Sequence, residues 1–379
     1  MQKNKILHII TDLNTGGAEM MLFKILNHFS KKNKIESFVI VLMGRSSLSD
    51  KFESIGINIK YLNLKEERIP SFRALLKMYN YTKLFKPTII QGWMYHSNLA
   101  ALLLKLFLPN NIKIYWNIRQ TLYNIKYEKN LSQLVIRILI LFSKYINKII
   151  YNSHISKNQH EKLGMDKSNS KIIYNGFEFN IYKPNPLSRK KIRAKYGIPD
   201  DAIVIGHIAR YHPMKNHKMV IHLASTIINS NSKVWFLMVG KNVSKHNSEL
   251  TSLMMNYKIK NRLLLIGEQL IIPEILTSFD IALSLSSWGE GFPNVIGEAM
   301  CSGLPVVATD VGDSKMIVGE YGSIIEPNNI INAVREINEY IDMDESKRNR
   351  LGLKGRDFII KNFSIENIGT EYYQLYSLR

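Results

Sequence analysis

Two successive series of short apolar runs, separated by segments of helix length, dominate this 379-residue chain. Continuous apolar runs are typical of parallel strands buried on both faces. Strands that alternate with helices predict doubly wound α/β sheets. The strand-like runs lie at 5–10, 37–43, 57–64, 88–93, 112–118 and 148–152, and then at 203–210, 234–240, 263–267, 281–286 and 305–309. The intervening helices include 71–85, 131–146, 218–228 and 293–302.

The alternation breaks once, at residues 174–200, where two X-Pro steps, glycines and a basic cluster occur together. Such composition marks a connecting segment, and the length of the chain suits two domains of ordinary size. We therefore predict an N-terminal domain over 1–180 and a C-terminal domain over 181–363. The basic run within the connection, RKKIRAKYG, is expected to be a solvated helix face.

Composition excludes several classes of protein. Hydrophobic residues make up 45% of the chain and charged residues 22%, which is ordinary for a protein with sizeable cores. A single cysteine, Cys301, excludes an intrachain disulfide framework and fits a reducing compartment, with packing as its simplest role. The longest apolar runs, 99–108 and 134–142, are too short to span a bilayer and contain Lys105 and Arg137. The N-terminus lacks a signal core, so we expect a cytoplasmic protein.

The net charge of +20 is unevenly distributed. Residues 1–180 hold 27 Lys+Arg and 11 Asp+Glu, a net +16, whereas residues 181–379 hold 24 and 20, a net +4. This imbalance indicates an anionic partner for the first half: an acidic membrane leaflet, a lipid pyrophosphate or nucleic acid. Enrichment in Lys, Asn and Ile through base composition is the alternative. Nucleic acid is disfavoured, because no aromatic-interleaved basic motif or zinc-finger spacing occurs.

Two carboxylates, Glu290 and Glu298, lie eight positions apart in the segment WGEGFPNVIGEAMCSGLPVVATD, residues 288–310. Glu290 falls in a loop after a predicted strand, and loops at the carboxyl ends of parallel strands are where ligands bind. Glu298 falls inside the following apolar helix, where an unpaired charge is costly unless it faces a polar ligand. The alternative is that Glu290 favours the helix start and Glu298 is solvated.

This segment, with its E-x7-E spacing, resembles the donor-site signature of retaining glycosyltransferases with the GT-B fold, in particular glycosyltransferase family 4. The resemblance covers nearly the whole chain and is most specific from 203 to 326. It implies two Rossmann-like domains that face each other across a cleft. The domain at 181–363 would bind a nucleotide-sugar donor, and the domain at 1–180 the acceptor. A C-terminal helix, 364–379, would pack back on the N-terminal domain.

The resemblance also implies roles for residues of the C-terminal domain. Arg210 and Lys215, five apart in ARYHPMKNH, resemble the family's R-x4-K motif. Two fixed cations there could clamp a diphosphate as the sugar leaves, although they could also be surface cations. Glu298 would bind the ribose hydroxyls, and Glu290 a hydroxyl of the donor sugar. Further donor contacts are expected from Gly240, Glu268, Gly291, Phe292, Pro293 and Asn294. Asp313 replaces a second glycine common in relatives, which could alter the donor loop.

In the N-terminal half, Gly16 and Gly17 follow the first strand and open a helix, an arrangement that suits phosphate binding but also a simple tight turn. By resemblance they form the family's glycine loop over the donor phosphates and acceptor. His96, after a strand end, would approach the transferred sugar, with a structural role as the alternative. Arg119, after the next strand, could bind an acceptor anion. Asn175-Gly176 resembles the family's hinge.

These observations together predict a retaining glycosyltransferase that moves a hexose or N-acetylhexosamine from a nucleotide sugar to a membrane-bound, lipid-linked saccharide. UDP is the expected nucleotide, with GDP-mannose as the main competitor. The product would be a cell-surface polysaccharide: O-antigen, capsule or lipopolysaccharide. The protein would lie on the cytoplasmic face of the inner membrane, with its basic domain on anionic lipid.

Neither a metal nor a cofactor is expected, because we find no Asp-x-Asp element or His/Asp/Glu cluster that would hold a divalent metal. Two alternatives remain open. One is a GT-B nucleotide-sugar epimerase, and the other is a basic nucleic-acid- or membrane-binding protein without transferase activity.

Overall fold

The computed structural model describes residues 4–32, 35–65, 70–259 and 261–377. The chain divides into two compact units. Unit 1 comprises residues 1–176 and 365–379, and unit 2 comprises residues 177–364. The chain therefore crosses between the units after Gly176 and after Ser364, whereas the sequence analysis placed these boundaries at 180/181 and 363/364.

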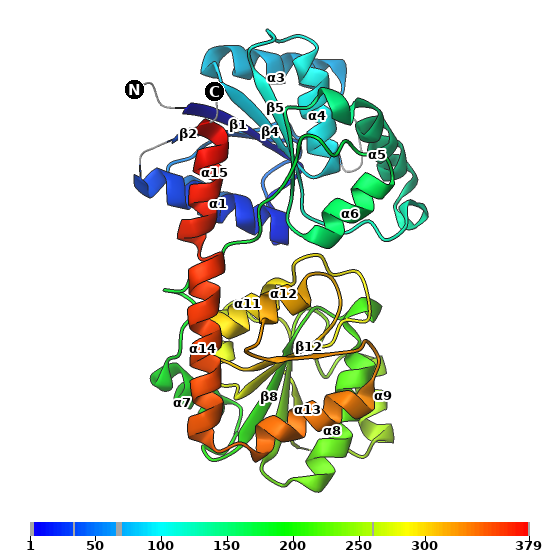
Figure 1. Ribbon diagram of the computed structural model, residues 1–379, viewed down its shortest axis with the longest axis vertical. Coiled ribbons are helices and arrows are strands. Elements are labelled where there is room, and N and C mark those ends of the chain that lie inside the picture. Colours follow the sequence, from blue (N-terminus) through cyan, green and yellow to red (C-terminus); the bar gives the residue numbers. More distant parts are fainter. Residues whose placement is uncertain (1–3, 33–34, 66–69, 260, 378–379) are drawn as a thin grey trace. The chain divides into compact units, whose positions relative to one another are not determined.

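Unit 1 is built on a seven-stranded parallel sheet with the order β3-β2-β1-β4-β5-β6-β7. The strand order reverses between β1 and β4, which makes this pair the switch point of the sheet. Figure 1 shows the sheet with helices on both of its faces. The strands are β1 (Asn4–Ile10), β2 (Ile35–Val41), β3 (Asn58–Tyr61), β4 (Ile89–Trp93), β5 (Lys113–Ile118), β6 (Lys148–Tyr151) and β7 (Ser170–Ile172).

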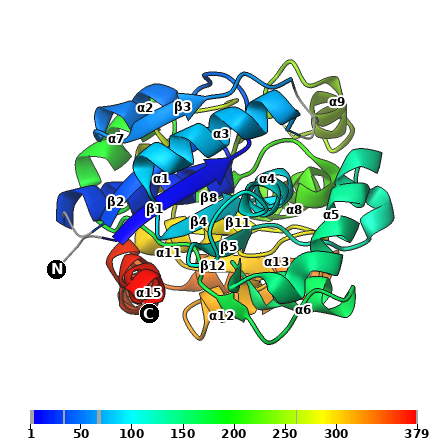
Figure 2. The same ribbon diagram turned by 90° about the horizontal axis from the view of Figure 1, so that it is seen from above.

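The helices of unit 1 cover two separate hydrophobic cores. One core lies beneath α3, α4 and α5, and the other lies beneath α1 and α15. Figure 2 shows α1 and α15 seen from above, and β1 in the sheet that they cover. The helices are α1 (Gly17–Lys32), α2 (Ser49–Ser54), α3 (Phe72–Phe85), α4 (Tyr95–Lys105), α5 (Asn130–Phe142), α6 (His154–Lys162) and α15 (Ile365–Ser377), with 3-10 turns η1 (Ile125–Tyr127) and η2 (Ser143–Tyr145).

Polar bonds hold α15 on unit 1. The Tyr376 hydroxyl donates to Gln91 Oε1 at 2.5 Å, and Asn117 Nδ2 donates to the Tyr372 hydroxyl at 2.8 Å. A side chain at Gly369 would overlap the ring of His28 on α1, so the two helices approach closely at this glycine. Helix α15 therefore belongs to unit 1, although it follows the whole of unit 2 in the sequence.

Unit 2 repeats the same plan with a six-stranded parallel sheet, in the order β10-β9-β8-β11-β12-β13. Its switch point lies between β8 and β11. The strands are β8 (Ile203–Ile208), β9 (Val234–Val239), β10 (Leu263–Leu265), β11 (Ile281–Ser284), β12 (Val306–Thr309) and β13 (Ser323–Ile325). The helices are α7 (Pro186–Lys195), η3 (Pro213–Lys215), α8 (His217–Ser230), α9 (Ser248–Asn256), α10 (Ile272–Thr277), α11 (Asn294–Cys301), α12 (Ser314–Val318), α13 (Ile330–Asp342) and α14 (Glu345–Phe363).

Two doubly wound parallel sheets were predicted from the sequence, and this fold class is confirmed. The expected connecting segment, 174–200, is wrong over most of its length, because α7 belongs to unit 2. Its basic run is also not wholly solvated. Arg189 and Arg193 each approach a carboxylate oxygen of Asp280 at 2.6 Å, and Arg193 is almost completely buried. Within the part of the chain that the structure describes, no helix is both long enough and apolar enough to cross a bilayer.

Candidate functional site

The switch point of unit 2 brings together charged side chains that lie far apart in the sequence. The loop after β8 carries Arg210 and leads into η3, which ends at Lys215. The loop between β11 and α11 carries Glu290. Because β8 and β11 are neighbouring parallel strands, both loops leave the sheet at its carboxyl edge.

Lys215 and Glu290 form an ion pair across this switch point. Their side chains are only 18% and 10% exposed, and Ser286 Oγ donates to the same carboxylate oxygen at 2.5 Å. The Ser286 carbonyl accepts from Thr309 Oγ1 at 2.6 Å, which ties the arrangement to the end of β12. A lysine ammonium has three donors, so Lys215 can hold Glu290 and an anionic ligand oxygen at the same time.

Arg210 is an exposed cation of this edge. Among the described residues its guanidinium makes no ion pair. Gly240, at the end of β9, has a φ of +150° and lies so close to Ala209 that any side chain would overlap the Ala209 carbonyl. Its N–H donates to the Gly267 carbonyl at 2.9 Å, and Glu268 follows as an exposed residue. The loops after β8, β9 and β10 are therefore packed against one another.

A second close approach fixes the backbone of Glu290. Gly312 has a φ of +66°, and a Cβ at this position would lie 2.5 Å from the Glu290 carbonyl oxygen. Asp313 donates its N–H to the Gly291 carbonyl at 2.8 Å. Asp313 itself has a φ of −92°, which any residue can adopt. Replacing the second glycine of the motif by aspartate therefore requires no backbone change here.

Glu298 lies half-buried in α11 and hydrogen-bonds to Tyr182. Burial, together with the negative charge of Glu298, raises the pKa of Tyr182. Among the expected donor contacts, Phe292 packs on another aromatic ring: it stacks on Phe177 with ring centroids 6.0 Å apart. Phe292 and Pro293 are buried, and Asn294 begins α11. These three residues shape the start of the helix that carries Glu298.

The sequence analysis missed a pair of histidines beneath the Arg210–Lys215 loop. The rings of His207 and His217 lie 5.2 Å apart, and His217 Nε2 lies 3.4 Å from the Ala209 carbonyl. Burial lowers the pKa of His207 to about 3 and that of His217 to about 4, so both are neutral at pH 7. No sequence pattern singles them out, because buried histidines have no characteristic spacing.

The switch point of unit 1 carries hydroxyl groups and a strained backbone. Thr11 Oγ1 and Ser97 Oγ lie 3.2 Å apart, between the end of β1 and the start of α4. Met94, which separates β4 from α4, has a φ of +69°. Such strain in a residue other than glycine concentrates at functional sites. His96, the expected sugar-facing histidine, lies half-buried in the first turn of α4 beside Ser97.

Glu19, in the first turn of α1, is a further candidate that the sequence analysis did not single out. Burial raises the pKa of its carboxyl group to about 7, and the nearby Asp12 adds to this effect. The Glu19 carboxylate folds back against Gly16, where a side chain would overlap it. Gly17 begins the helix, and Met20 N donates to the Gly16 carbonyl at 3.0 Å. The order Gly-Gly-Ala-Glu after the first strand was the available signal.

Two family descriptions match consecutive parts of the chain. "Glycosyltransferase Family 4" matches residues 15–180, and "Glycosyl transferases group 1" matches residues 188–358. The chain belongs to the family 4-type glycosyltransferases.

Relatives and solved structures agree with this assignment. The "Putative glycosyltransferase EpsF" of Bacillus subtilis (strain 168) is 23% identical over 84% of this chain and 82% of that protein. An Escherichia coli "UDP-Gal:alpha-D-GlcNAc-diphosphoundecaprenol alpha-1,3-galactosyltransferase" is 28% identical over 54% of this chain and 53% of that protein. The crystal structure of Anabaena Alr3699/HepE in complex with UDP superimposes with a TM-score of 0.85 at 22% identity, covering 99% of this chain and 100% of that one.

Arg119 does not present its charge at the ligand edge of this glycosyltransferase. Its buried guanidinium donates to Asn117 Oδ1 at 3.2 Å, to the Tyr372 hydroxyl at 3.1 Å and to Asn175 Oδ1. It also lies over the Trp93 ring. The expectation that Arg119 binds an acceptor anion is therefore not supported, because these donors link β5 to α15 and to the segment before the boundary.

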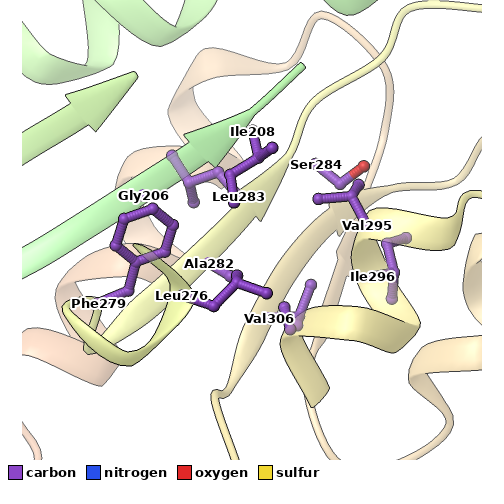
Figure 3. A pocket seen from close by; sticks show the side chains of 11 residues that line it. Gly206, Ile208, Leu276, Phe279, Ala282, Leu283, Ser284, Val295, Ile296 and Val306 are labelled. Carbon is purple, nitrogen blue, oxygen red and sulfur yellow. The ribbon is translucent and has the colours of Figure 1, made fainter. Parts of the chain in front are cut away.

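A small internal cavity in unit 2 does not serve as a binding site. Its volume is about 10 Å³, and Figure 3 shows it between β8, β11 and the start of α11. A cavity of this size holds roughly one water molecule. Its lining is mostly apolar, from Phe279, Leu283 and Ile296 among others. The charged loops at the carboxyl edge are the better site for a polar ligand.

Proposed function

We propose that this chain is a retaining glycosyltransferase that moves a hexose or N-acetylhexosamine from a UDP-sugar to a lipid-linked saccharide. The observation that carries the proposal is the charged switch point of unit 2, where Arg210, Lys215 and Glu290 leave neighbouring strands. Nucleotide diphosphates carry concentrated negative charge, and two fixed cations at the carboxyl edge of a parallel sheet are suited to it.

In this proposal the cations and the two carboxylates have different tasks. Arg210 and Lys215 neutralise the diphosphate as it leaves, so the reaction proceeds without a metal ion. Glu290, held by Lys215 and Ser286, receives a hydroxyl of the donor sugar. Glu298 binds the ribose hydroxyls from the side of α11. In unit 2, Gly240 and Gly291 bring backbone close to the donor. In unit 1, the family resemblance assigns the glycine loop at Gly16–Gly17 to phosphate binding and His96 to sugar recognition.

The names of relatives support the choice of donor and acceptor. Alr3699/HepE was crystallised with UDP and with UDP-glucose, and the E. coli relative is named for a UDP-sugar donor and a diphosphoundecaprenol acceptor. A polyprenyl-linked acceptor lies in a membrane. We therefore extend the proposal to synthesis of a cell-surface polysaccharide at the cytoplasmic face of the inner membrane, with the basic unit 1 on anionic lipid.

A thermal-shift panel of UDP-, GDP-, ADP- and dTDP-sugars without metal tests the donor proposal. A ligand at a hundred times its Kd adds about 2.7 kcal/mol of stability. We expect UDP-sugars to stabilise the parent but not Glu298→Ala. Glu336→Ala, which removes a half-buried helical glutamate on α13, is the matched control and should respond like the parent. Stabilisation by none of the four nucleotides would refute the proposed donor site.

A nucleotide-sugar epimerase is the second candidate, because it can share this architecture. Incubation with a UDP-sugar in the absence of acceptor separates the two activities. An epimerase converts the sugar while it stays attached to the nucleotide, whereas the transferase leaves the donor sugar unchanged until an acceptor is added. Transfer to a polyprenyl-diphosphate saccharide should yield a product with the anomeric configuration of the donor. Inversion of that configuration would refute the retaining mechanism.

A further inference from the structure

Positive charge in unit 1 is concentrated in one continuous part of the chain. Residues 71–148 contain 12 lysines and arginines but only one carboxylate, Glu128, which gives a net charge of +11. This segment includes α3, α4 and α5, whose inner sides share one hydrophobic core. Helix α4 packs against both α3 and α5, so the three helices form one layer on the sheet (Figure 1).

The outer side of α5 is apolar although its inner side already faces a core. Val135, Ile136 and Leu139 are completely buried. Leu134 is nevertheless 49% exposed and Leu141 68% exposed. A surface helix of a globular protein ordinarily places polar residues opposite its buried stripe. The unpartnered apolar side of α5 therefore indicates contact with something other than water.

Basic and aromatic side chains accompany this apolar side. Arg137 is exposed between Leu134 and Leu141. Just beyond the helix, Tyr145 is 68% exposed, and Lys144 Nζ lies 5.0 Å from its ring centroid. Aromatic rings and basic residues next to apolar ones are the composition of helices that lie in a membrane interface.

An apolar groove continues the same outer layer between α3 and the end of α4. It has a volume of about 220 Å³, and its lining is entirely Phe72, Leu75, Leu76, Tyr79 and Phe107. Phe72 is 72% exposed. An apolar groove of this kind can receive a hydrocarbon chain but offers little to a polar ligand.

We propose that the outer side of α3, α4 and α5 docks on an anionic lipid bilayer. The apolar side of α5 enters the boundary between headgroups and acyl chains, a lipid hydrocarbon chain occupies the α3–α4 groove, and the surrounding lysines and arginines contact anionic headgroups. Each basic residue near such a surface contributes roughly fivefold to binding. The inference rests on the proposed function only because that function supplies the reason for the protein to meet a membrane. The charge and the exposure of these side chains do not depend on the donor site.

Flotation of the full chain with lipid vesicles tests the proposal. Vesicles of phosphatidylcholine are compared with vesicles that also contain phosphatidylglycerol. The parent should float only with the anionic vesicles, and less at high salt. Leu134→Glu/Leu141→Glu should reduce binding roughly tenfold or more, because two apolar side chains no longer enter the boundary. The control is Leu187→Glu/Leu353→Glu in unit 2, where Leu353 has the same 49% exposure as Leu134, and it should bind like the parent.

Several results would overturn the proposal. These are equal binding to both kinds of vesicle, no binding by the parent, or equal binding by the α5 variant and its control. A shift from dimer to monomer in the α5 variant, with vesicle binding retained, would assign the surface to a second copy of the chain. Thermal shift with UDP-glucose on the same samples separates the two proposals. Vesicle binding without nucleotide stabilisation would refute the donor site alone, and the reverse would refute the docking surface alone.

Discussion

The two units share one sheet topology but place their charge differently. In both, the strand order runs 3-2-1-4-5-6 when each sheet is counted from its own first strand, and unit 1 adds a seventh. Unit 2 carries its important charges at the switch point, as the Lys215–Glu290 pair and the exposed Arg210. The switch point of unit 1 has neutral hydroxyls at Thr11 and Ser97. Its excess positive charge lies in the segment 71–148 instead.

This difference separates two kinds of recognition on one fold. Charges at strand ends are held by neighbouring loops, as Glu290 is by Ser286 and by the backbone at Gly312. Such preorganisation suits a small anionic ligand of defined shape. Charges spread over an exposed surface have no fixed geometry and suit an extended anionic partner. The fold therefore supplies the scaffold, and the placement of charge decides what each unit binds.

Removing a cation from the switch point of unit 2 should have the largest effect. We expect Arg210→Ala to lower kcat/KM by about 10²-fold or more, because a fixed charge no longer stabilises the leaving diphosphate. Steady-state transfer assays measure the change. Arg350→Ala, which removes an exposed arginine of α14, is the control and should keep the parent rate. Parent-like transfer by Arg210→Ala would refute the role of this residue.

Gly312, the glycine that holds Glu290 in place, should be a sensitive backbone position of the edge. Gly312→Ala adds a Cβ 2.5 Å from the Glu290 carbonyl and keeps an unfavourable φ, so we expect a loss of about 3 kcal/mol. Gly197→Ala is the matched control, since Gly197 also has a φ of +66° but nothing lies within 4 Å of the added Cβ. It should cost about 1 kcal/mol in denaturant unfolding. Equal losses would mean that the contact between the two loops is unimportant.

The sequence predicted most of the fold because the buried strands are long and continuously apolar. β7 and β13 were missed, since each is a three-residue edge strand that begins with serine, whereas the equally short β10 consists of three leucines and was predicted. The segment 174–200 was misassigned for a different reason. Prolines and glycines do occur there, but the tertiary ion pairs of Arg189 and Arg193 with Asp280 fasten α7 to unit 2. Contacts of this range are invisible to local composition.

The candidate site was predicted in part. Arg210, Lys215 and Glu290 were singled out by motif, but their ion pairing depends on the neighbouring positions of β8 and β11. For Arg119 the expectation from the sequence was not supported. A cation after a strand end looked available to a ligand, yet Tyr372, 253 residues further on, accepts one of its hydrogen bonds. The pKa values of His207 and His217 are lowered mainly by burial, which no spacing reveals.

The same Glu→Gln substitution should have opposite effects on the stability of the two units. Burial raises the pKa of Glu19 to about 7, so above pH 7 the folded protein bears the cost of an ionised carboxylate that the unfolded chain does not. Glu19→Gln should then raise stability by about 2 kcal/mol above pH 7 and by little at pH 4.5. Glu290→Gln leaves Lys215 without its counter-charge and should lower stability by about 2 kcal/mol at pH 7. Thermal unfolding of both variants across this pH range measures whether each is more or less stable than the parent. If both variants were stabilised, or both destabilised, the two edges would not differ in this respect.

Acid should destabilise both units through buried histidines, which is where they are most alike. Burial lowers the pKa of His8 to about 3 and that of His160 to about 4 in unit 1, matching His207 and His217 in unit 2. An unfolded histidine takes up a proton below about pH 6.5, whereas these folded ones remain neutral until about pH 4. Unfolding therefore binds protons between about pH 6.5 and pH 4. As the pH is lowered through this window, the free energy of unfolding falls by up to about 1.4 kcal/mol per pH unit for each histidine.

Single substitutions can assign this acid sensitivity to one unit or the other. His8→Gln and His207→Gln should each flatten the dependence of stability on pH between about 6 and 4 by a similar amount, because each removes one suppressed proton site. Both will also lower stability at neutral pH, so the slope rather than the absolute value is the quantity to compare. His246→Gln removes an exposed histidine and should leave the slope unchanged. If only one of His8→Gln and His207→Gln flattened the dependence of stability on pH, the units would differ in acid response as well as in the placement of charge.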